Sequence, residues 1–282
     1  MKPSIVIVSC LLFASCGNKN QKIKTNDLKR HEIKGRVSNV STSIYENSGG
    51  DDNGLYLKHI QESKYNDQGN LIEYTDINNT GEIKQKISYK YNDNGHRLEG
   101  DFFYAIGPNN YKHTYKCDDN GNILEDKTYE SDGKLSDKTS YEYNNSGDIS
   151  QEKCTNISGE LIFKIVYKYD TKNNVTEIDN YNNKDGSLGV KNVYEYNNQE
   201  KKIEQIAFNY NSLSKGELDA KVIYHYDFKG NEIEAIYYNA DGSLNYRELY
   251  TYDDIGNVIE IINTYNDGVS ISYKKIIKYV YY

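Results

Sequence analysis

Short runs of alternating apolar and polar residues follow one another along most of this chain, and each run ends at a polar stretch containing glycine. The runs are 8 to 11 residues long and rich in Tyr, Ile, Val and Thr, which is typical of β-strands. "YTYDDIGNVIE" (250–260) shows the pattern, and "YHYDFKGNEIE" (224–234) and "YKYDTKNNVTE" (167–177) repeat it. The pattern therefore predicts strands joined by turns.

The runs are arranged in a repeat, most often 26 residues long, with two glycine positions in each copy. The first position is occupied by Gly69, Gly95, Gly121, Gly147, Asn173, Glu200, Gly230 and Gly256. The second is occupied by Gly81, Gly107, Gly133, Gly159, Gly186, Gly216, Gly242 and Gly268. A fixed period of this size indicates a repeat architecture.

Each first turn carries Asp or Asn three residues before its glycine position, as Asp253 precedes Gly256. This spacing predicts a type I turn closed by a residue with positive φ, which joins two strands in a hairpin. Glu200 is the poorest fit to that position. Counting Ile33–Tyr45 and the last run "YKKIIKYVYY", we expect roughly 18 strands. The predicted fold is all-β: a long antiparallel β-meander of repeated hairpins, forming an open, twisted or curled sheet.

The turn geometry also predicts which side chains share a face of the sheet. It places Tyr252 opposite Val258 and Tyr250 opposite Glu260, so the tyrosines of each "YxY" and the following Glu are expected on one face. The other face changes from Lys90, Lys116, Glu142 and Lys168 to Ile223, Ile233, Leu249 and Ile259 near the C-terminus.

The recurring glutamates are the first candidates for chemistry: Glu73, Glu99, Glu125, Glu177, Glu204, Glu234 and Glu260. A catalytic carboxylate pair is unique in a protein, whereas these recur on every second strand, so we interpret them as structural. The five histidines lack metal-ligand spacing, and "DDNG" (51–54, 118–121) lacks the rest of a calcium loop. We expect no enzyme activity, no cofactor and no metal.

Composition narrows the partners further. The net charge is −8 with acids and bases mixed along the chain, which argues against nucleic acid binding. The chain has 30 tyrosines and no tryptophan. Tyrosine rings on a sheet can cover the sheet itself, stack on sugars or bury a partner's surface.

The N-terminus is predicted to be a targeting segment. Lys2 and the apolar residues 5–13 precede Cys16, as in a bacterial lipoprotein signal whose cysteine is lipidated. The predicted organisation is therefore a signal peptide (1–15), a polar tether (16–30) and a single repeat domain (31–282). Cys117 and Cys154 fall three strands apart, too far for a disulfide, so both are expected to be free thiols.

The motif "YxYDxxGNxxE…DGxL" resembles the YD-repeat (Rhs-like) family of bacterial proteins over about residues 55–282. Long members of that family wind a β-sheet into a hollow shell. Eight repeats are fewer than those members have, so we expect an open sheet here.

These observations lead to two functional hypotheses. The first is a non-catalytic, lipid-anchored envelope protein, most readily at the outer membrane, that binds glycan or protein. The alternative, implied by the resemblance, is an interaction component of a secretion or interbacterial antagonism system. The insertion "FNYNSLSKG" (208–216) interrupts the constant repeat, and Phe208, Tyr210 and Leu213 form the candidate binding loop.

Overall fold

The computed structural model describes residues 26–47, 54–106, 110–183, 185–210 and 216–282, which form one 18-stranded antiparallel sheet and one short helix. The helix is α1 (Asp27–Arg30). The strands are β1 (Val37–Asn47), β2 (Leu55–Tyr65), β3 (Leu71–Asn78), β4 (Ile83–Tyr91), β5 (Arg97–Tyr104), β6 (Tyr111–Cys117), β7 (Ile123–Tyr129), β8 (Leu135–Tyr143), β9 (Ile149–Asn156), β10 (Leu161–Tyr169), β11 (Val175–Tyr181), β12 (Leu188–Tyr196), β13 (Lys202–Asn209), β14 (Glu217–Tyr226), β15 (Glu232–Asn239), β16 (Leu244–Tyr252), β17 (Val258–Thr264) and β18 (Ile271–Tyr281).

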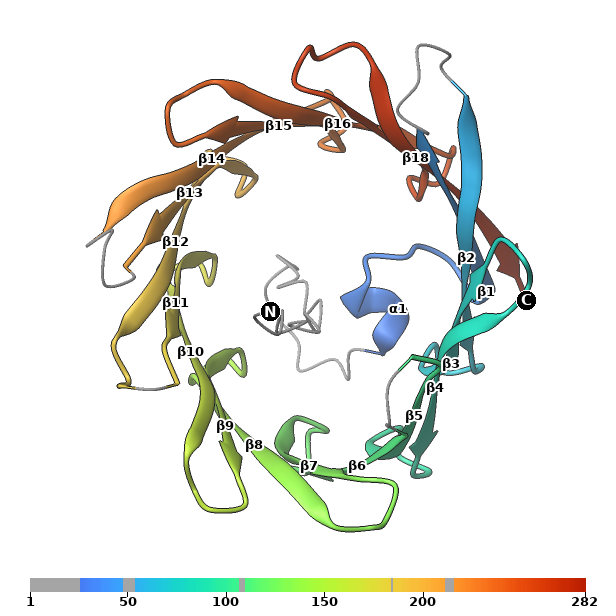
Figure 1. The fold of residues 1–282 in the computed structure, drawn as a ribbon, viewed down its shortest axis with the longest axis vertical. Helices are drawn as coiled ribbons and strands as arrows, with labels where there is room; N and C mark the ends of the chain where they lie inside the picture. The colour runs from blue at the N-terminus through green and yellow to red at the C-terminus, as the bar shows by residue number, and fades with distance from the viewer. Residues whose placement is uncertain (1–25, 48–53, 107–109, 184, 211–215) are drawn as a thin grey trace.

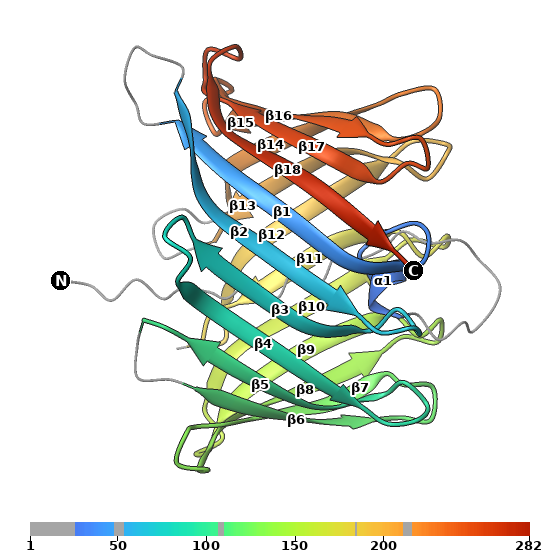
Figure 2. The same cartoon turned by 90° about the vertical axis from the view of Figure 1, so that its right-hand side faces the viewer.

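The sheet is a closed barrel, so the expectation of an open sheet is wrong. β1 pairs antiparallel with β18 on one side and with β2 on the other, with Ser41 opposite both Lys278 and Glu62. Figure 1 shows the resulting ring, and Figure 2 shows its strands tilted relative to the barrel axis. The number of strands is as predicted, but it suffices for closure.

Irregularities in strand pairing account for the curvature that the sequence reading underestimated. Every neighbouring pair of strands except β5–β6 contains a register shift, usually beside a turn. A β-bulge bends its strand and increases the local twist. Bulges at so many places distribute bending around the whole sheet and bring β18 to β1.

The first turns have the predicted geometry. In the β16–β17 turn the Gly256 amide donates to the Asp253 carbonyl at 3.0 Å, and Asp253 N donates to Asn257 O at 2.9 Å. Gly256 has φ of 84°, and Asn173 and Glu200 take the same conformation with φ of 70° and 62°. The predicted pairing of Tyr252 with Val258 is confirmed.

The predicted placement of the glutamates is wrong by one residue. Thr251, not Tyr250, lies opposite Glu260, because the register shifts between Thr251 and Tyr252. The same shift recurs where Lys90 pairs with Glu99 and Tyr91 with Arg97. The tyrosines and the glutamates consequently occupy opposite faces of the sheet.

The tyrosine face is the inner wall of the barrel. Helix α1 lies within the ring in Figure 1, and Asp27 of this helix contacts Tyr91, which fixes the face that points inward. Buried side chains are few, and they gather near α1 (Leu28, Val37, Val40 and Tyr65) and on β14–β15 (Val222, Tyr224 and Ala235). Barrels of 16 to 18 strands are too wide for wall side chains to fill.

No helix in the part of the chain that the structure describes has the length and apolar character needed to cross a membrane.

Candidate functional site

Tyrosine is the principal lining of the lumen. The second tyrosine of the "YxY" motifs in β4, β8, β10, β12, β14 and β16 donates its hydroxyl to the carbonyl of the residue that begins the preceding strand, as Tyr143 does to Ile123 at 2.7 Å and Tyr252 to Glu232 at 2.6 Å. Tyr91, Tyr169, Tyr196, Tyr226 and Tyr279 make the same bond. Cys117 takes this position in its own repeat, with Sγ 3.5 Å from the Arg97 carbonyl. The rings therefore lie along the wall and satisfy carbonyls near one end of the barrel.

Several tyrosine hydroxyls of the inner wall converge on one carboxylate, that of Glu248 in β16. Its carboxylate accepts hydrogen bonds from the hydroxyls of Tyr250 (2.8 Å), Tyr273 (2.8 Å) and Tyr237 (3.2 Å). Burial and the Glu248 charge raise the pKa of all three hydroxyls, so they act as neutral donors. We call Glu248 and its three tyrosines the Glu248 cluster.

Aromatic surface extends the Glu248 cluster across neighbouring strands. The rings of Tyr237 and Tyr246 are stacked with centroids 4.0 Å apart. Opposite Glu248 on β15 lies Ala235, whose small side chain is fully buried beneath its neighbours. Lys202 places its ammonium 4.1 Å from the Tyr224 ring centre. The result is a partly buried patch of rings with a carboxylate at its centre.

Elsewhere on the inner wall, burial raises the pKa of two carboxyl groups, Glu152 and Glu232. Burial raises the pKa of Glu152, although its carboxylate accepts a 2.7 Å hydrogen bond from the Tyr167 hydroxyl. Burial also raises the pKa of Glu232, which the nearby Lys202 charge partly offsets. Carboxyl groups with a raised pKa are candidates for acid–base chemistry. As for metals, no group of three or more His, Cys, Asp or Glu within the described residues could hold an ion.

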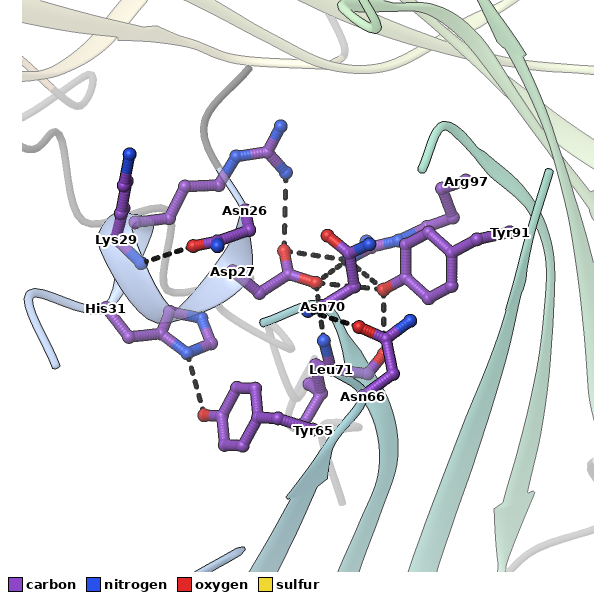
Figure 3. Close-up of polar contacts among 11 residues, drawn as sticks. Asn26, Asp27, Lys29, His31, Tyr65, Asn66, Asn70, Leu71, Tyr91 and Arg97 are labelled. Atoms are coloured by element: carbon purple, nitrogen blue, oxygen red, sulfur yellow. Dashed lines mark hydrogen bonds and ion pairs between the residues drawn. The ribbon is translucent and has the colours of Figure 1, made fainter. Parts of the chain in front are cut away.

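A second polar centre joins α1 to the wall (Figure 3). Asp27 Oδ2 accepts from the Leu71 amide and from the Tyr91 hydroxyl, both at 2.8 Å. Its Oδ1 lies 3.2 Å from Arg97 Nη2 and 3.4 Å from Arg30 Nη1. Burial acts to raise the pKa of Asp27, but the two arginines and the hydrogen bonds hold that pKa below its usual value.

The segment around α1 reaches from one turn to another across the closing strand. Leu28 N donates to Gly69 O in the β2–β3 turn at 3.0 Å. Lys34 N donates to Asn257 Oδ1 in the β16–β17 turn at 2.7 Å, and Asn257 Nδ2 returns a bond to Lys34 O. These turns flank the place where β1 meets β18 and β2. We call residues 26–36 the clasp, and its contacts indicate a structural role.

The clasp and the Glu248 cluster are the features that sequence reasoning missed. Asp27 fell within the predicted tether, where the only signal was the sequence Asn26-Asp27, typical of a helix start; Asn26 Oδ1 indeed accepts from Lys29 N. Glu248 has no repeated counterpart, so a search for recurring positions could not find it.

The predicted candidate loop is not assembled into one site by the described residues. Phe208 lies on the outer wall in β13, opposite Lys191 and Leu218, and is half-buried. The Tyr210 ring lies over Gly216, where an added Cβ would be 2.8 Å from it. Leu213 and Cys16 lie outside the described residues. The prediction that Cys117 and Cys154 are free thiols is confirmed.

The outer wall carries the repeated glutamates, each paired with cations. Glu73 contacts Lys64 at 2.7 Å and Lys86 at 2.8 Å, and Glu99 contacts Lys90 and Lys112, both at 2.9 Å. Glu125, Glu177, Glu204, Glu234 and Glu260 are paired with Lys, Arg or His in the same way. This arrangement agrees with the structural interpretation of the glutamates.

No family model and no curated protein matches the sequence. A porin-like protein from Bacteroides uniformis is similar in structure, with a TM-score of 0.47 and 10% identity over 86% of this chain and 97% of that chain. A chain of a TcdB2-TccC3-Cdc42 structure matches with a TM-score of 0.36 and 13% identity over 90% of this chain and 17% of that one. A chain of the Photorhabdus luminescens Tc holotoxin pore matches with a TM-score of 0.35 and 14% identity, over 86% and 16%. This chain thus spans less than a fifth of the two longer chains.

Proposed function

We propose that this protein is a non-catalytic binding protein of the bacterial cell envelope, anchored by a lipid on Cys16, which holds a carbohydrate chain against the tyrosines of its lumen. The Glu248 cluster is the observation that carries the proposal. Sugars present apolar ring faces and hydroxyl edges, and the patch offers stacked tyrosine faces beside a carboxylate and several phenol hydroxyls.

The state of the luminal groups supports binding over catalysis. The tyrosine hydroxyls have raised pKa values, so they are not phenolate nucleophiles near neutral pH. Glu248 accepts hydrogen bonds from three of them, which hold its carboxylate in place, and the oxygen of each phenol can still accept a hydrogen bond from a sugar hydroxyl.

The outer wall supports anchoring through the N-terminus. Barrels that face lipid carry an apolar outer band, whereas ion pairs such as Glu73–Lys86 and Glu99–Lys112 cross this wall in mid-strand. We therefore propose that the lipid on Cys16, and not the wall, attaches the protein to the membrane. The intact mass of protein extracted from membranes should show an acylated Cys16 as the first residue, and Cys16→Ser should release the protein into the soluble fraction.

A glycan array with the purified full-length chain tests the binding proposal. Tyr246→Ala removes one of the two stacked rings and should weaken a captured glycan by roughly tenfold, the value of one aromatic contact. Tyr129→Ala is the matched control, because this tyrosine lies on the outer wall opposite Lys112 and Leu135. An array without a hit, or equal losses for the two variants, would contradict the luminal carbohydrate site.

A further inference from the structure

The two walls of the barrel differ in what their carboxylates contact. On the outer wall the repeated glutamates are paired with cations, as Glu73 is with Lys64 and Lys86. On the inner wall, among the residues that the structure describes, no Lys or Arg lies within ion-pair distance of Glu248 or Glu232. Neutral tyrosine hydroxyls contact Glu248 where a lysine would be found on the outer wall. The Glu248 cluster therefore keeps a negative charge that its hydrogen bonds do not neutralise.

Glu232 adds a second carboxyl group to the same part of the lumen. It lies on β15, next to the strand that carries Glu248. Burial and, to a smaller extent, the Glu248 charge raise the pKa of Glu232, against the opposing charge of Lys202. A ligand cation would be attracted by both carboxyl groups, whereas a neutral ligand would leave their repulsion unchanged.

The carboxylate of Glu248 can accept a further hydrogen bond. An ionised carboxylate has about four acceptor positions on its two oxygens. Oε2 accepts from Tyr250 and Tyr237, whereas Oε1 accepts, within the described part of the chain, only from Tyr273. The remaining position on Oε1 and the phenol oxygens are all acceptors. An ammonium group matches this set, because it has three donors and no acceptor.

Tyrosine faces of the inner wall already hold ammonium groups from the chain itself. The Lys202 ammonium lies 4.1 Å from the ring centre of Tyr224, and the Lys275 ammonium lies 5.4 Å from that of Tyr273. Both distances are within the range in which a cation is attracted to an aromatic face. The lumen is thus built from surfaces that stabilise ammonium groups.

The stacked rings of Tyr237 and Tyr246, beside Glu248, receive no such cation from the chain. No lysine or arginine of the described residues lies over either ring. Aromatic rings grouped around a carboxylate are the arrangement that recognises ligand ammonium groups in proteins. The Glu248 cluster has this arrangement without a cation from the protein to complete it.

We propose that the Glu248 cluster binds a primary ammonium group, so that the glycan held in the lumen is a chain of amino sugars with free amino groups. This inference rests on the proposed carbohydrate site and adds the charge of its ligand. The ammonium donates to Glu248 Oε1 and to the phenol oxygens around it, and the sugar ring that carries it packs against Tyr246.

Isothermal titration calorimetry of the purified full-length chain at pH 6 tests the proposal with two ligands. The glucosamine tetramer and the N-acetylglucosamine tetramer share rings and linkages, but acetylation removes the ammonium charge. The wild type should bind the glucosamine tetramer roughly tenfold more tightly, the effect of one hydrogen bond between charged groups. Equal affinities, or tighter binding of the acetylated tetramer, overturn the inference and leave the proposed carbohydrate site standing.

A pair of variants assigns the preference to the Glu248 cluster. Glu248→Gln keeps an acceptor oxygen for the tyrosines and removes the charge, so it should lose the tenfold preference while binding the acetylated tetramer as before. Asp137→Asn is the matched control, because Asp137 shares the luminal face of Tyr143 on β8, across the ring from β16 (Figure 1). It should keep the preference. Circular dichroism checks that both variants are folded, and equal losses in both would overturn the assignment to Glu248.

Spermidine separates the ammonium group from the sugar. It carries ammonium groups without rings, so it should bind more weakly than the glucosamine tetramer, since nothing packs against Tyr246. Spermidine that binds as tightly as the tetramer would overturn the amino sugar and contradict the proposed function with it. If neither tetramer binds, the inference is wrong, and the glycan array decides separately whether another carbohydrate occupies the lumen.

Discussion

At the residue scale, the turn at Glu200 shows that a repeat position can override the preference of its side chain. Glu200 has φ of 62°, a conformation that costs a non-glycine residue about 1–2 kcal/mol. Its exposed contact with Lys172 at 3.8 Å offsets little of this cost. Glu200→Gly should therefore stabilise the protein by about 1 kcal/mol in urea unfolding.

The reciprocal change is the control for Glu200. Gly147 has φ of 88° at the same repeat position, and an added Cβ there would meet nothing within 4 Å. Gly147→Glu should therefore destabilise by about 1–2 kcal/mol through conformation alone. Changes of the same sign at both positions would show that the turn conformation is not what is measured.

Glu152 gives a second prediction, on pH. Its pKa is raised by burial, so the stability it provides is full below its ordinary value of 4.5 and is lost as the pH rises through the raised value. Glu152→Gln keeps an acceptor for Tyr167 and removes the charge. Its melting temperature should match the wild type at pH 4 and exceed it at pH 8. The exposed Glu142→Gln should change the melting temperature at neither pH, and a pH-independent effect of Glu152→Gln would contradict the assignment.

At the scale of single elements, the clasp is the element whose loss should matter most. Asp27 is 4% exposed and is the ion-pair partner of the largely buried Arg97. Asp27→Ala should cost about 3 kcal/mol of unfolding free energy, since it leaves the arginine charge unpaired. Because the pKa of Asp27 is lowered, its contribution is present above the usual value of 3.8 and is lost as the pH falls below it.

Asp132→Ala is the matched control for the clasp, because Asp132 pairs with Lys134 on the surface. It should leave the unfolding free energy almost unchanged, because an exposed ion pair is screened by water. A similarly small effect of Asp27→Ala would show that α1 does not hold the seam.

The turns and strands show how far the sequence alone could lead. Asp253 and Gly256 specify their turn through local chemistry, so the number of strands and the pairing of Tyr252 with Val258 were predictable. The face of the sheet on which Glu260 lies could not be predicted, because a one-residue bulge beyond the turn moves every later side chain to the other face. Asp27 acts on Arg97 and Leu71 across long sequence distances, which no local pattern records.

At the scale of the whole molecule, closure depends on the sum of many small bends. No single bulge encodes it, so the repeat motif is equally compatible with an open sheet and with a barrel. Closure also needs β1, which lacks the repeat motif and yet pairs with β18 and β2. The sequence could predict the repeating unit, whereas the joint between its first and last strands depends on the whole assembly.

The pairing of β1 with β18 can be tested with an engineered disulfide. Ser41 of β1 and Lys278 of β18 are directly opposite in the barrel, and such pairs have Cα atoms about 4.5–5.5 Å apart, within reach of a disulfide. In an open sheet the two residues would lie at opposite edges. Ser41→Cys, Lys278→Cys should therefore form an intramolecular cross-link under mild oxidation, seen as a joined peptide by mass spectrometry.

Ser41→Cys, Glu62→Cys pairs β1 with β2 and should cross-link in either arrangement. Ser41→Cys, Lys127→Cys places the thiols six strands apart and should not. The native thiols should interfere little, because burial raises the pKa of Cys154 to about 11 and also raises that of Cys117. If only the Glu62 pair cross-links, the sheet is open in solution; if the Lys278 pair also cross-links, β1 closes the barrel.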